Sequence, residues 1–380
     1  MAKIIQITTF FHPVIGGVEQ HVLELSKELV KKGHQVTIFC SDSTRTKKRI
    51  KKLEQNIGKI KIFRFKTLIS ISQFYKIYPG LLFRLLKSDY DIVHVHGFRK
   101  FEIYIALIVS KFKNKKIIIT THNPFTTTNR NKFLQLFVNF HDITVGKILC
   151  RYIDHIICLN KSEIRYLKQF HIKEKNISII PNGISDYSFL DGDKRKFIRK
   201  YHISAKKYKY KVLWLGRLNK VKGLDNLEIA VKQLKDTLFI FAGPDDNASI
   251  YYKNLYKNCR NILFTGEILH KDTIHAYKAA DLFVLPSIHE PFGIVLIEAM
   301  AQGLPIVSTN IGGTLYIIKE KFGVLLNPYD QWGWLINIKK LLYNRPLRKQ
   351  MGNLAREEAE NYRWSNLAEK INNIYKILLK

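Results

Sequence analysis

Two glutamates bracket the start of a predicted helix, where carboxylates and backbone amides could together meet a ligand. Between residues 282 and 307 an apolar run, a helical pattern and a second apolar run predict a strand–loop–helix–strand unit. Pro291 and Gly293 would fix the turn, so Glu290 lies just before the helix N-terminus and its free N–H groups. Glu298 follows one to two turns later. This arrangement suits a ligand with hydroxyl and phosphate groups; the alternative is an ordinary crossover with a capping Glu290 and a solvated Glu298.

A second group of residues suits a diphosphate. Arg217 and Lys222 lie in a glycine-flanked loop that follows a predicted strand over residues 211–216. Arginine offers a planar fork of donors and lysine a point charge, and both bind phosphate oxygens well. In a chain this basic, an arginine near a lysine could also be ordinary surface charge.

Two histidines end successive predicted strands of buried type. Residues 91–97 finish in His96 and Gly97, and residues 116–122 finish in His122. Open α/β sheets bind ligands at the carboxyl ends of their strands, so both imidazoles are site candidates. The alternative for each is a structural histidine held by hydrogen bonds.

A glycine pair separates the first predicted strand, residues 4–11, from a predicted helix over residues 18–32. Gly16 and Gly17 would let the backbone approach a ligand, as in a Rossmann-like opening, or would form a plain turn. The pair is not part of a GxGxxG pattern, so a nicotinamide cofactor is not supported.

Composition indicates a two-domain globular protein. The chain has 380 residues, 46% of them hydrophobic, which is too long for one small core. No run of about 18 apolar residues predicts a transmembrane helix, and the first residues resemble a strand rather than a signal peptide. The four cysteines are scattered without a CxxC pair, which fits a reducing cytoplasm and no structural zinc.

The formal net charge of +32 indicates a polyanionic partner. Residues 1–200 hold 37 Lys and Arg against 15 Asp and Glu, so the excess is concentrated there. A basic run at 45–52 and a basic, aromatic segment at 72–87 favour an anionic membrane surface. The alternatives are a solvated loop, a core helix and a compositional excess of lysine. No zinc finger, RRM or helix-turn-helix pattern supports nucleic acid.

Several segments resemble, in order, the motifs of the retaining GT-B glycosyltransferases of family 4, the glycosyltransferase group 1 family. The two glutamates and the intervening Pro-Phe-Gly resemble its E-x7-E signature. The other matching segments are Gly16-Gly17-Val18-Glu19 (GGVE), Pro181-Asn182-Gly183-Ile184 (PNG), Gly216-Arg217 with Lys222-Gly223 (GR-x4-KG), Ala242-Gly243-Pro244-Asp245 (AGPD), Asn310-Ile311-Gly312-Gly313 (NxGG) and Gly323-Val324-Leu325-Leu326 (GxLL).

The resemblance implies a GT-B α/β fold with two Rossmann-like domains facing across a cleft. Residues 1–184 would form the acceptor-side domain, 185–210 a linker or hinge, and 211–360 the nucleotide-sugar-binding domain. Residues 361–380 would form a last helix that crosses back to the first domain.

The resemblance also implies an activity. A hexose would move from a nucleoside diphosphate-sugar, UDP- or GDP-linked, to a glycan or lipid-linked acceptor with retained configuration. The protein would be cytoplasmic, with peripheral contact at the inner face of the membrane. The donor base, the sugar, the acceptor and the oligomeric state stay open.

The implied site residues divide by role. Arg217 and Lys222 would stabilise the leaving diphosphate, His122 would face the reacting sugar, and Glu290 would hold that sugar. Glu290 also competes for the role of a covalent nucleophile, which we do not assign. The remaining implied contacts are the backbone amides of Phe292, Gly293 and Ile294, Glu298 at the ribose, Gly16, Gly17, Gly266 and Ile268 for the donor, Glu19 and His96 on the acceptor side, and the NxGG amides near sugar and phosphate.

The resemblance implies no cofactor, and we expect no metal. The two DxD triplets, at residues 89–91 and 191–193, are interpreted as turn residues. Two other kinds of protein remain open: another GT-B enzyme, such as a glycogen synthase-like transferase or a phosphorylase, and a basic membrane- or nucleic-acid-binding protein on an inactive transferase scaffold.

Overall fold

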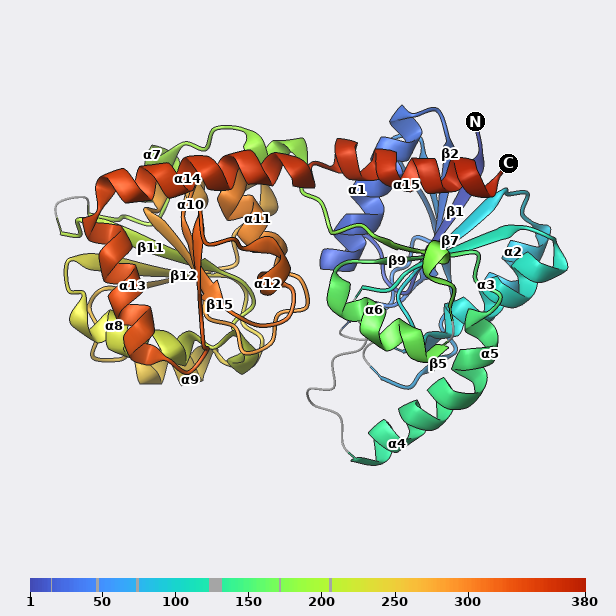
Figure 1. Cartoon of the computed structure of the whole chain (residues 1–380), viewed down its shortest axis with the longest axis horizontal. Coiled ribbons are helices and arrows are strands. Elements are labelled where there is room, and N and C mark those ends of the chain that lie inside the picture. The colour runs from blue at the N-terminus through green and yellow to red at the C-terminus, as the bar shows by residue number, and fades with distance from the viewer. Residues whose placement is uncertain (15, 46–47, 73–74, 123–131, 171, 205–206) are drawn as a thin grey trace. The chain divides into compact units, whose positions relative to one another are not determined.

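The computed structural model describes residues 1–380 except 15, 46–47, 73–74, 123–131, 171 and 205–206 (Figure 1). The chain divides into two compact units. The first comprises Met1–Gly183 with Trp364–Lys380, and the second comprises Ile184–Arg363. Each unit is an α/β body around its own sheet.

The first unit contains a sheet of eight strands within the described residues, all parallel except for the last pair, β4 and β3. In spatial order the strands are β10 (Ile177–Ile179), β9 (His155–Cys158), β8 (Lys116–Thr120), β7 (Ile92–His96), β1 (Lys3–Thr8), β2 (Gln35–Ser41), β4 (Ile60–Phe65) and β3 (Glu54–Ile57). A separate two-stranded sheet pairs β5 (Ile69–Ser70) with β6 (Lys76–Ile77).

Helices cover both faces of this sheet because its strands alternate apolar side chains between two cores. On β1, Ile5 and Ile7 belong to one core and Ile4 to the other. The helical elements of the first unit are α1 (Gly17–Lys31), α2 (Gly80–Lys87), α3 (Phe101–Phe112), α4 (Lys132–His141), the π-helix η1 (Asp142–Gly146), α5 (Lys147–Cys150), α6 (Lys161–Leu167), η2 (Lys168–Phe170), η3 (Glu174–Asn176) and α15 (Trp364–Leu378).

The last helix, α15, packs beside α1 in the first unit (Figure 1). Leu367, Ile371 and Tyr375 are buried on it at helical spacing, in the same core as Val22 and Leu25 of α1. An amphipathic helix far along the chain therefore completes the core of the N-terminal unit.

The two segments expected to meet a membrane are partly exposed and partly held by contacts inside the first unit. In the run 45–52, Arg49 donates to both carboxylate oxygens of Asp42, at 2.7 and 2.8 Å. In the segment 72–87, Tyr78 and Leu81 are fully buried in the core, and Leu81 belongs to α2. Phe83, Arg84, Leu86 and Lys87 are exposed, so one face of this segment packs in the core and the other does not.

In its described residues, the second unit has six parallel strands in the order β13-β12-β11-β14-β15-β16. The strands are β11 (Tyr210–Leu215), β12 (Thr237–Ala242), β13 (Ile262–Gly266), β14 (Leu282–Leu285), β15 (Ile306–Thr309) and β16 (Gly323–Leu326). The helical elements are η4 (Asp186–Phe189), α7 (Lys194–Lys200), η5 (Lys220–Lys222), η6 (Leu224–Leu227), α8 (Glu228–Gln233), α9 (Ser249–Leu255), α10 (His270–Ala279), α11 (Ile294–Ala301), α12 (Thr314–Ile317), α13 (Gln331–Tyr343), α14 (Arg345–Ala359) and η7 (Glu360–Tyr362).

Residues 185–210, which we expected to form a linker, lie in the second unit instead. Helix α7 packs on α10, with Phe197 buried. The high charge of this segment hid its buried apolar side chains, which also include Phe189 and Ile203.

Both sheets share the doubly wound pattern. In the second sheet, β12 and β13 follow β11 along the chain on one side of it, and β14 then pairs with its other side. In the first sheet, β1 lies between β2 and β7. Where the winding reverses, consecutive loops diverge and leave room for a ligand at the carboxyl ends. These points are β1/β7 and β11/β14.

Within the described residues, the structure contains no helix that is long and apolar enough to span a membrane.

Candidate functional site

The loop that carries Glu290 joins β14 to α11 at the carboxyl end of the second sheet. Gly293 has φ +98°, a left-handed conformation that glycine adopts without strain, and α11 begins at the next residue. The Glu290 side chain is buried, and its Oε2 accepts a hydrogen bond from Lys222 Nζ at 2.7 Å. The structure therefore joins two predicted site residues, 68 positions apart in the sequence, in one ion pair.

Lys222 reaches Glu290 because two loops pack closely at the β11/β14 switch point. Lys222 ends the short helix η5, and Gly223 follows with φ +63°. A Cβ atom at position 223 would lie 2.1 Å from the carbonyl oxygen of Pro286, at the end of β14. Glycine is thus required twice over here, by its conformation and by this contact.

The Gly312-Gly313 loop packs against the Glu290 loop. A Cβ atom at 312 would lie 2.2 Å from the Glu290 carbonyl oxygen, and one at 313 would lie 2.4 Å from Phe292 Cα. The Gly313 amide donates to the Glu290 carbonyl at 2.9 Å. This amide, expected near the sugar and phosphate, instead holds the loop in place. In the first turn of α11 the Leu296 amide donates to the Gly293 carbonyl at 2.9 Å, so the amides of Ile294 and Val295 remain the local donors.

Glu298 lies on α11, facing α10. Tyr277 donates its hydroxyl to Glu298 Oε2 at 2.8 Å. Burial raises the pKa of Glu298, while the charge of His270 and the Tyr277 hydrogen bond offset part of that rise. The solvated alternative is therefore wrong: Glu298 is a half-buried acceptor with one oxygen held by Tyr277.

Arg217 is exposed and paired with a residue that the sequence did not single out. Its Nη1 donates to Asp246 Oδ2 at 2.8 Å, and Asn219 Nδ2 donates to the same oxygen at 3.1 Å. The loops after β11 and β12 meet here: a Cβ atom at Gly243 would lie 1.7 Å from the Gly216 carbonyl oxygen.

Gly266 and Ile268 lie at the carboxyl end of β13. Gly266 has φ +70°, and its carbonyl accepts from the amide of Gly243 at 2.9 Å. Gly266 is exposed and Ile268 half-buried. The predicted base-contacting turn thus exists as a backbone feature, tied to the loop that also holds Gly216.

In the first unit, Gly16 and Gly17 lie at the start of α1, next to an ion pair. Gly16 is the N-cap with extended backbone, and a Cβ atom there would lie 2.1 Å from Arg45 Nη2. Arg45 Nη2 donates to both carboxylate oxygens of Glu19, at 3.0 and 2.9 Å. Arg45, which we expected in a solvated or membrane-facing loop, instead anchors the predicted acceptor-side glutamate.

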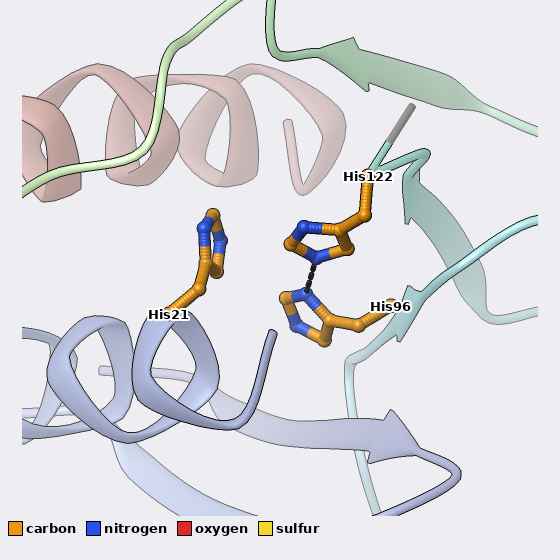
Figure 2. Close-up of side chains that lie close together, drawn as sticks. All are labelled: His21, His96 and His122. Carbon is orange, nitrogen blue, oxygen red and sulfur yellow. Dashed lines mark hydrogen bonds between the residues drawn. The ribbon is translucent and has the colours of Figure 1, made fainter. Parts of the chain in front are cut away.

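Three histidines gather at the carboxyl ends of β7 and β8. His96 ends β7, His122 follows β8 with φ +55°, and His21 comes from α1. Figure 2 shows the three rings facing one another. His96 Nδ1 and His122 Nε2 are hydrogen-bonded at 3.1 Å, and one nitrogen from each histidine lies within 4.8 Å of the other two.

The hydrogen-bond partners set the proton positions on two of these rings. His21 Nδ1 lies 2.8 Å from Asn182 Oδ1, and His96 Nε2 lies 2.5 Å from Gln6 Oε1. Because amide oxygens only accept, each of these nitrogens carries its ring proton. His96 Nδ1 then presents a lone pair, which accepts the His122 proton, and His21 Nε2 presents another.

All three imidazoles are held neutral. Burial lowers the pKa of His21 to about 4, and it lowers those of His96 and His122 well below the ordinary value, with help from neighbouring histidines. Such a group offers lone pairs and N–H donors without charge.

The carboxylates of the two DxD triplets have partners within the protein. Asp89 pairs with the Lys3 side chain, and Asp91 Oδ2 accepts from the Lys3 amide at 2.8 Å. Asp191 pairs with Lys278 at 2.9 Å, and Asp193 caps α7. Among the described residues, His21, His96 and His122 lie close enough together to hold a metal ion.

Sequence reasoning missed the partners that hold the predicted residues: Asp246, Tyr277, Arg45 and His21. Each is distant in sequence from the residue it contacts, or lies on a helix whose face the periodicity did not fix. A signal for His21 was available, since it lies in the first turns of the helix after the glycine pair.

Known families match consecutive parts of this chain. The family described as Glycosyltransferase Family 4 matches residues 15–186, and Glycosyl transferases group 1 matches residues 194–358. An uncharacterized glycosyltransferase of Methanocaldococcus jannaschii is 26% identical over 99% of both chains. One component of the human phosphatidylinositol N-acetylglucosaminyltransferase is 24% identical over 98% of this chain and 75% of that protein.

Solved structures are similar over the whole length. The Anabaena protein Alr3699/HepE, crystallised with UDP, superposes with a TM-score of 0.78 at 16% identity, covering 99% of this chain and 100% of that one. Other crystals of that protein contain UDP with glucose, or UDP-glucose. With two Rossmann-like sheets and both family matches in sequence order, the chain belongs to the group 1 glycosyltransferases of family 4, which have the GT-B fold.

Proposed function

We propose that this glycosyltransferase moves a hexose from a UDP- or GDP-linked donor to a glycan or lipid-linked acceptor, with retained anomeric configuration and without a metal ion. The observation that carries the proposal is the Lys222–Glu290 pair at the β11/β14 switch point. It places a cation for a phosphate beside a carboxylate for sugar hydroxyls, next to the first amides of α11.

The donor would replace existing contacts at this site. Lys222 and Arg217 each hold a carboxylate now, and a diphosphate would take over these cations. Glu290 would then be free to accept hydrogen bonds from the transferred sugar. When the bond from the anomeric carbon to the diphosphate breaks, the leaving oxygens gain charge, which the two cations stabilise where no divalent metal is needed.

Retention requires that the acceptor oxygen attack the face from which the diphosphate departs. The acceptor's proton would pass to a leaving diphosphate oxygen as the new glycosidic bond forms. His122, neutral and placed after β8, would donate a hydrogen bond at that face once its Nε2 proton leaves His96 Nδ1. Glu290 stays the competitor for a covalent role.

Glu298 is suited to the ribose of the donor. Tyr277 holds one of its oxygens, which leaves the other able to accept from a pair of hydroxyls. The phosphatidylinositol N-acetylglucosaminyltransferase relative and the excess charge of the first 200 residues support a lipid-linked or phosphorylated acceptor.

The test is isothermal titration calorimetry against UDP-, GDP- and ADP-sugars, with Lys222→Ala, Arg217→Ala and the control Lys220→Ala. Lys220 lies on the same short helix, but its Nζ lies over the Tyr251 ring, 4.3 Å from the centroid. We expect one nucleotide to bind, both site variants to lose that binding and the control to keep it. Equal binding in all four proteins would contradict the proposed site.

An inactive scaffold with a membrane or nucleic-acid role is not favoured, because Arg217, Lys222, Glu290 and Glu298 are all present and positioned. A transfer assay in EDTA tests metal independence: undiminished turnover supports it, and turnover that returns only with added Mg²⁺ or Mn²⁺ contradicts it. Formation of a sugar phosphate from a glycan and free phosphate would identify a phosphorylase instead.

We also propose that the first unit contacts an anionic membrane. The supporting surface is an exposed apolar stripe on the helical segment formed by α4, η1 and α5 and the two residues after it. Its members are Leu136, Phe140, Ile143, Ile148 and Tyr152. The spacings are four, three, five and four residues, and the step of five crosses the π-helix, whose wider turn keeps the later side chains in line.

Basic side chains accompany this stripe. Lys147 and Arg151 lie on the same segment, and Lys111 of the neighbouring α3 lies over the Tyr152 ring. Apolar side chains beside cations match the interface of an anionic bilayer.

Vesicle co-sedimentation tests this surface, with phosphatidylglycerol and phosphatidylcholine vesicles at low and high salt. We expect binding to phosphatidylglycerol alone, weakened by salt and by the double change Phe140→Ser and Ile143→Ser. The control changes two exposed isoleucines of the second unit, Ile250→Ser and Ile336→Ser. If the control loses as much binding as the stripe variant, the stripe is not the contact.

A further inference from the structure

We propose that His21, His96 and His122 form a binding site for a late first-row divalent ion of the Zn²⁺ class, with three imidazole nitrogens and one open coordination position. The rings come from α1, the end of β7 and the turn after β8, so the site is built on the carboxyl edge of the first sheet (Figure 2).

The strongest observation is a buried lone pair without a partner. His21 is 1% exposed, and among the described residues its Nε2 has no hydrogen-bond partner. Its Nδ1–H is taken by Asn182 Oδ1, so Nε2 can only accept. A buried acceptor with no donor is unusual in a folded protein, and an ion or a water molecule would satisfy it.

A second lone pair is prepared in the same way. His96 donates its Nε2 proton to Gln6 Oε1, which leaves Nδ1 as an acceptor facing His122. An amide oxygen behind each ring is the arrangement by which proteins orient metal-binding histidines: it fixes the tautomer and makes the ligating nitrogen more basic.

The third ligand needs one proton to move. His122 now donates its Nε2 proton to His96 Nδ1, at 3.1 Å. If the proton resides on Nδ1 instead, Nε2 becomes the third lone pair, and the ion replaces the hydrogen bond between the two rings. No net change in protonation is required, because a neutral imidazole carries one proton in either tautomer.

The geometry is close to that of a tetrahedral site. Nitrogen atoms bound to one zinc ion at 2.0–2.1 Å lie about 3.3 Å apart. The His96–His122 separation is 3.1 Å, and the three ligand atoms lie within 4.8 Å of one another.

Ligand chemistry selects the ion. Three neutral imidazoles bind Zn²⁺, Co²⁺, Ni²⁺ or Cu²⁺, whereas Mg²⁺ and Ca²⁺ prefer oxygen ligands.

The occupied site would withdraw His122 from any contact with a sugar. A bound ion would therefore inhibit transfer rather than support it. The binding itself is measured without donor or acceptor, so its failure and that of the transferase proposal are distinguishable.

Co²⁺ reports the site directly, because four-coordinate Co²⁺ absorbs visible light much more strongly than the hydrated ion. We would titrate CoCl₂ into the full-length protein after treatment with a chelator, and then displace it with ZnCl₂. We expect a strong visible band at one equivalent, abolished by Zn²⁺ and unaffected by excess Mg²⁺. A spectrum equal to that of Co²⁺ in buffer would overturn the proposal.

Variants locate the ion. His21→Ala removes a ligand and should weaken Zn²⁺ binding by more than about 100-fold, because even residues behind the ligands contribute 10–100-fold. Asn182→Ala keeps all three ligands but loses the oxygen behind His21, so we expect a loss of about 10–100-fold. The control is His155→Ala, a buried histidine of the same sheet whose Nε2 bonds Ser178 Oγ at 2.9 Å. Unchanged binding in both His21→Ala and Asn182→Ala would overturn the assignment.

Discussion

The two units place predicted site residues at equivalent positions, the switch points of their sheets, yet they supply different chemistry. In the second unit the groups are charged and paired: Lys222 with Glu290, and Arg217 with Asp246. In the first unit the three histidines are neutral, and amide oxygens hold two of them, His21 and His96. A ligand must exchange ions in one unit, but meets uncharged donors and lone pairs in the other.

The two ion pairs that Lys222 and Arg217 form in the second unit differ in how deeply they are buried. The Lys222 and Glu290 side chains are 20% and 9% exposed, whereas Arg217 is 57% exposed. A buried pair depends on both partners, because removal of one leaves an uncompensated charge. An exposed pair contributes little to stability and is easily replaced by a ligand.

The largest expected effect follows from breaking the buried pair. Lys222→Ala should destabilise the protein by about 3–5 kcal/mol, because Glu290 would be left buried and charged. Urea denaturation measures this loss. The double variant Lys222→Met, Glu290→Gln should recover most of the stability without recovering donor binding. If it stays as unstable as Lys222→Ala, loop packing rather than the charge pair explains the effect.

The neutral histidines predict loss of stability in acid. Burial lowers the pKa of His155 to about 4, below the ordinary 6.5 that applies after unfolding. The unfolded chain therefore binds the proton first, so stability is complete above pH 6.5 and falls as the pH drops toward 4. At about 1.4 kcal/mol per pKa unit, His155 contributes roughly 3 kcal/mol to this fall.

Unfolding free energies of wild type and His155→Asn between pH 7 and 4 measure that contribution. The variant should be less stable at neutral pH but less sensitive to acid, by about one bound proton. Parallel curves for the two proteins would show that His155 is protonated equally in the folded and unfolded states, against the direction of its pKa shift.

Tyr277→Phe should have an intermediate effect. The change removes the hydroxyl that holds Glu298, at a cost of about 1–3 kcal/mol for a buried acceptor left without a donor. We expect weaker donor binding with little change in turnover, because the ribose contact is made equally in the ground and transition states. Steady-state kinetics decide this: a fall in kcat at unchanged KM would place Glu298 in the chemistry instead.

Much of this architecture can be predicted from the sequence, because its signals are local. Buried parallel strands appear as continuous apolar runs, and the residues that end them point to the sites: Arg217, His96 and the loop of Glu290 all follow this rule. Positive-φ glycines such as Gly223 and Gly293 mark the turns between these elements.

Other features depend on contacts that no local pattern contains. Asp246 and Arg45 were ordinary charges in a charged chain until folding placed them on Arg217 and Glu19. The segment 185–210 was too polar to predict as structured, because its buried side chains are scattered among charged residues: Phe189, Phe197, Ile203, Tyr208 and Tyr210. His21 was not assigned to the site because the sequence does not fix which face of α1 turns toward the ends of β7 and β8.

The smallest expected effect sharpens the contrast between the exposed pair and the buried one. Asp246→Asn should leave stability nearly unchanged and tighten donor binding by up to about fivefold, because an exposed ion pair worth roughly 0–1 kcal/mol no longer competes with the diphosphate for Arg217. The neighbouring Asp245→Asn is the control, since Asp245 Oδ1 accepts from the amides of Ala248 and Ser249 instead. Calorimetry with the preferred donor measures both. Weaker binding in Asp246→Asn alone would mean that this carboxylate orients Arg217 for the diphosphate, so that even the exposed pair is part of the assembled site.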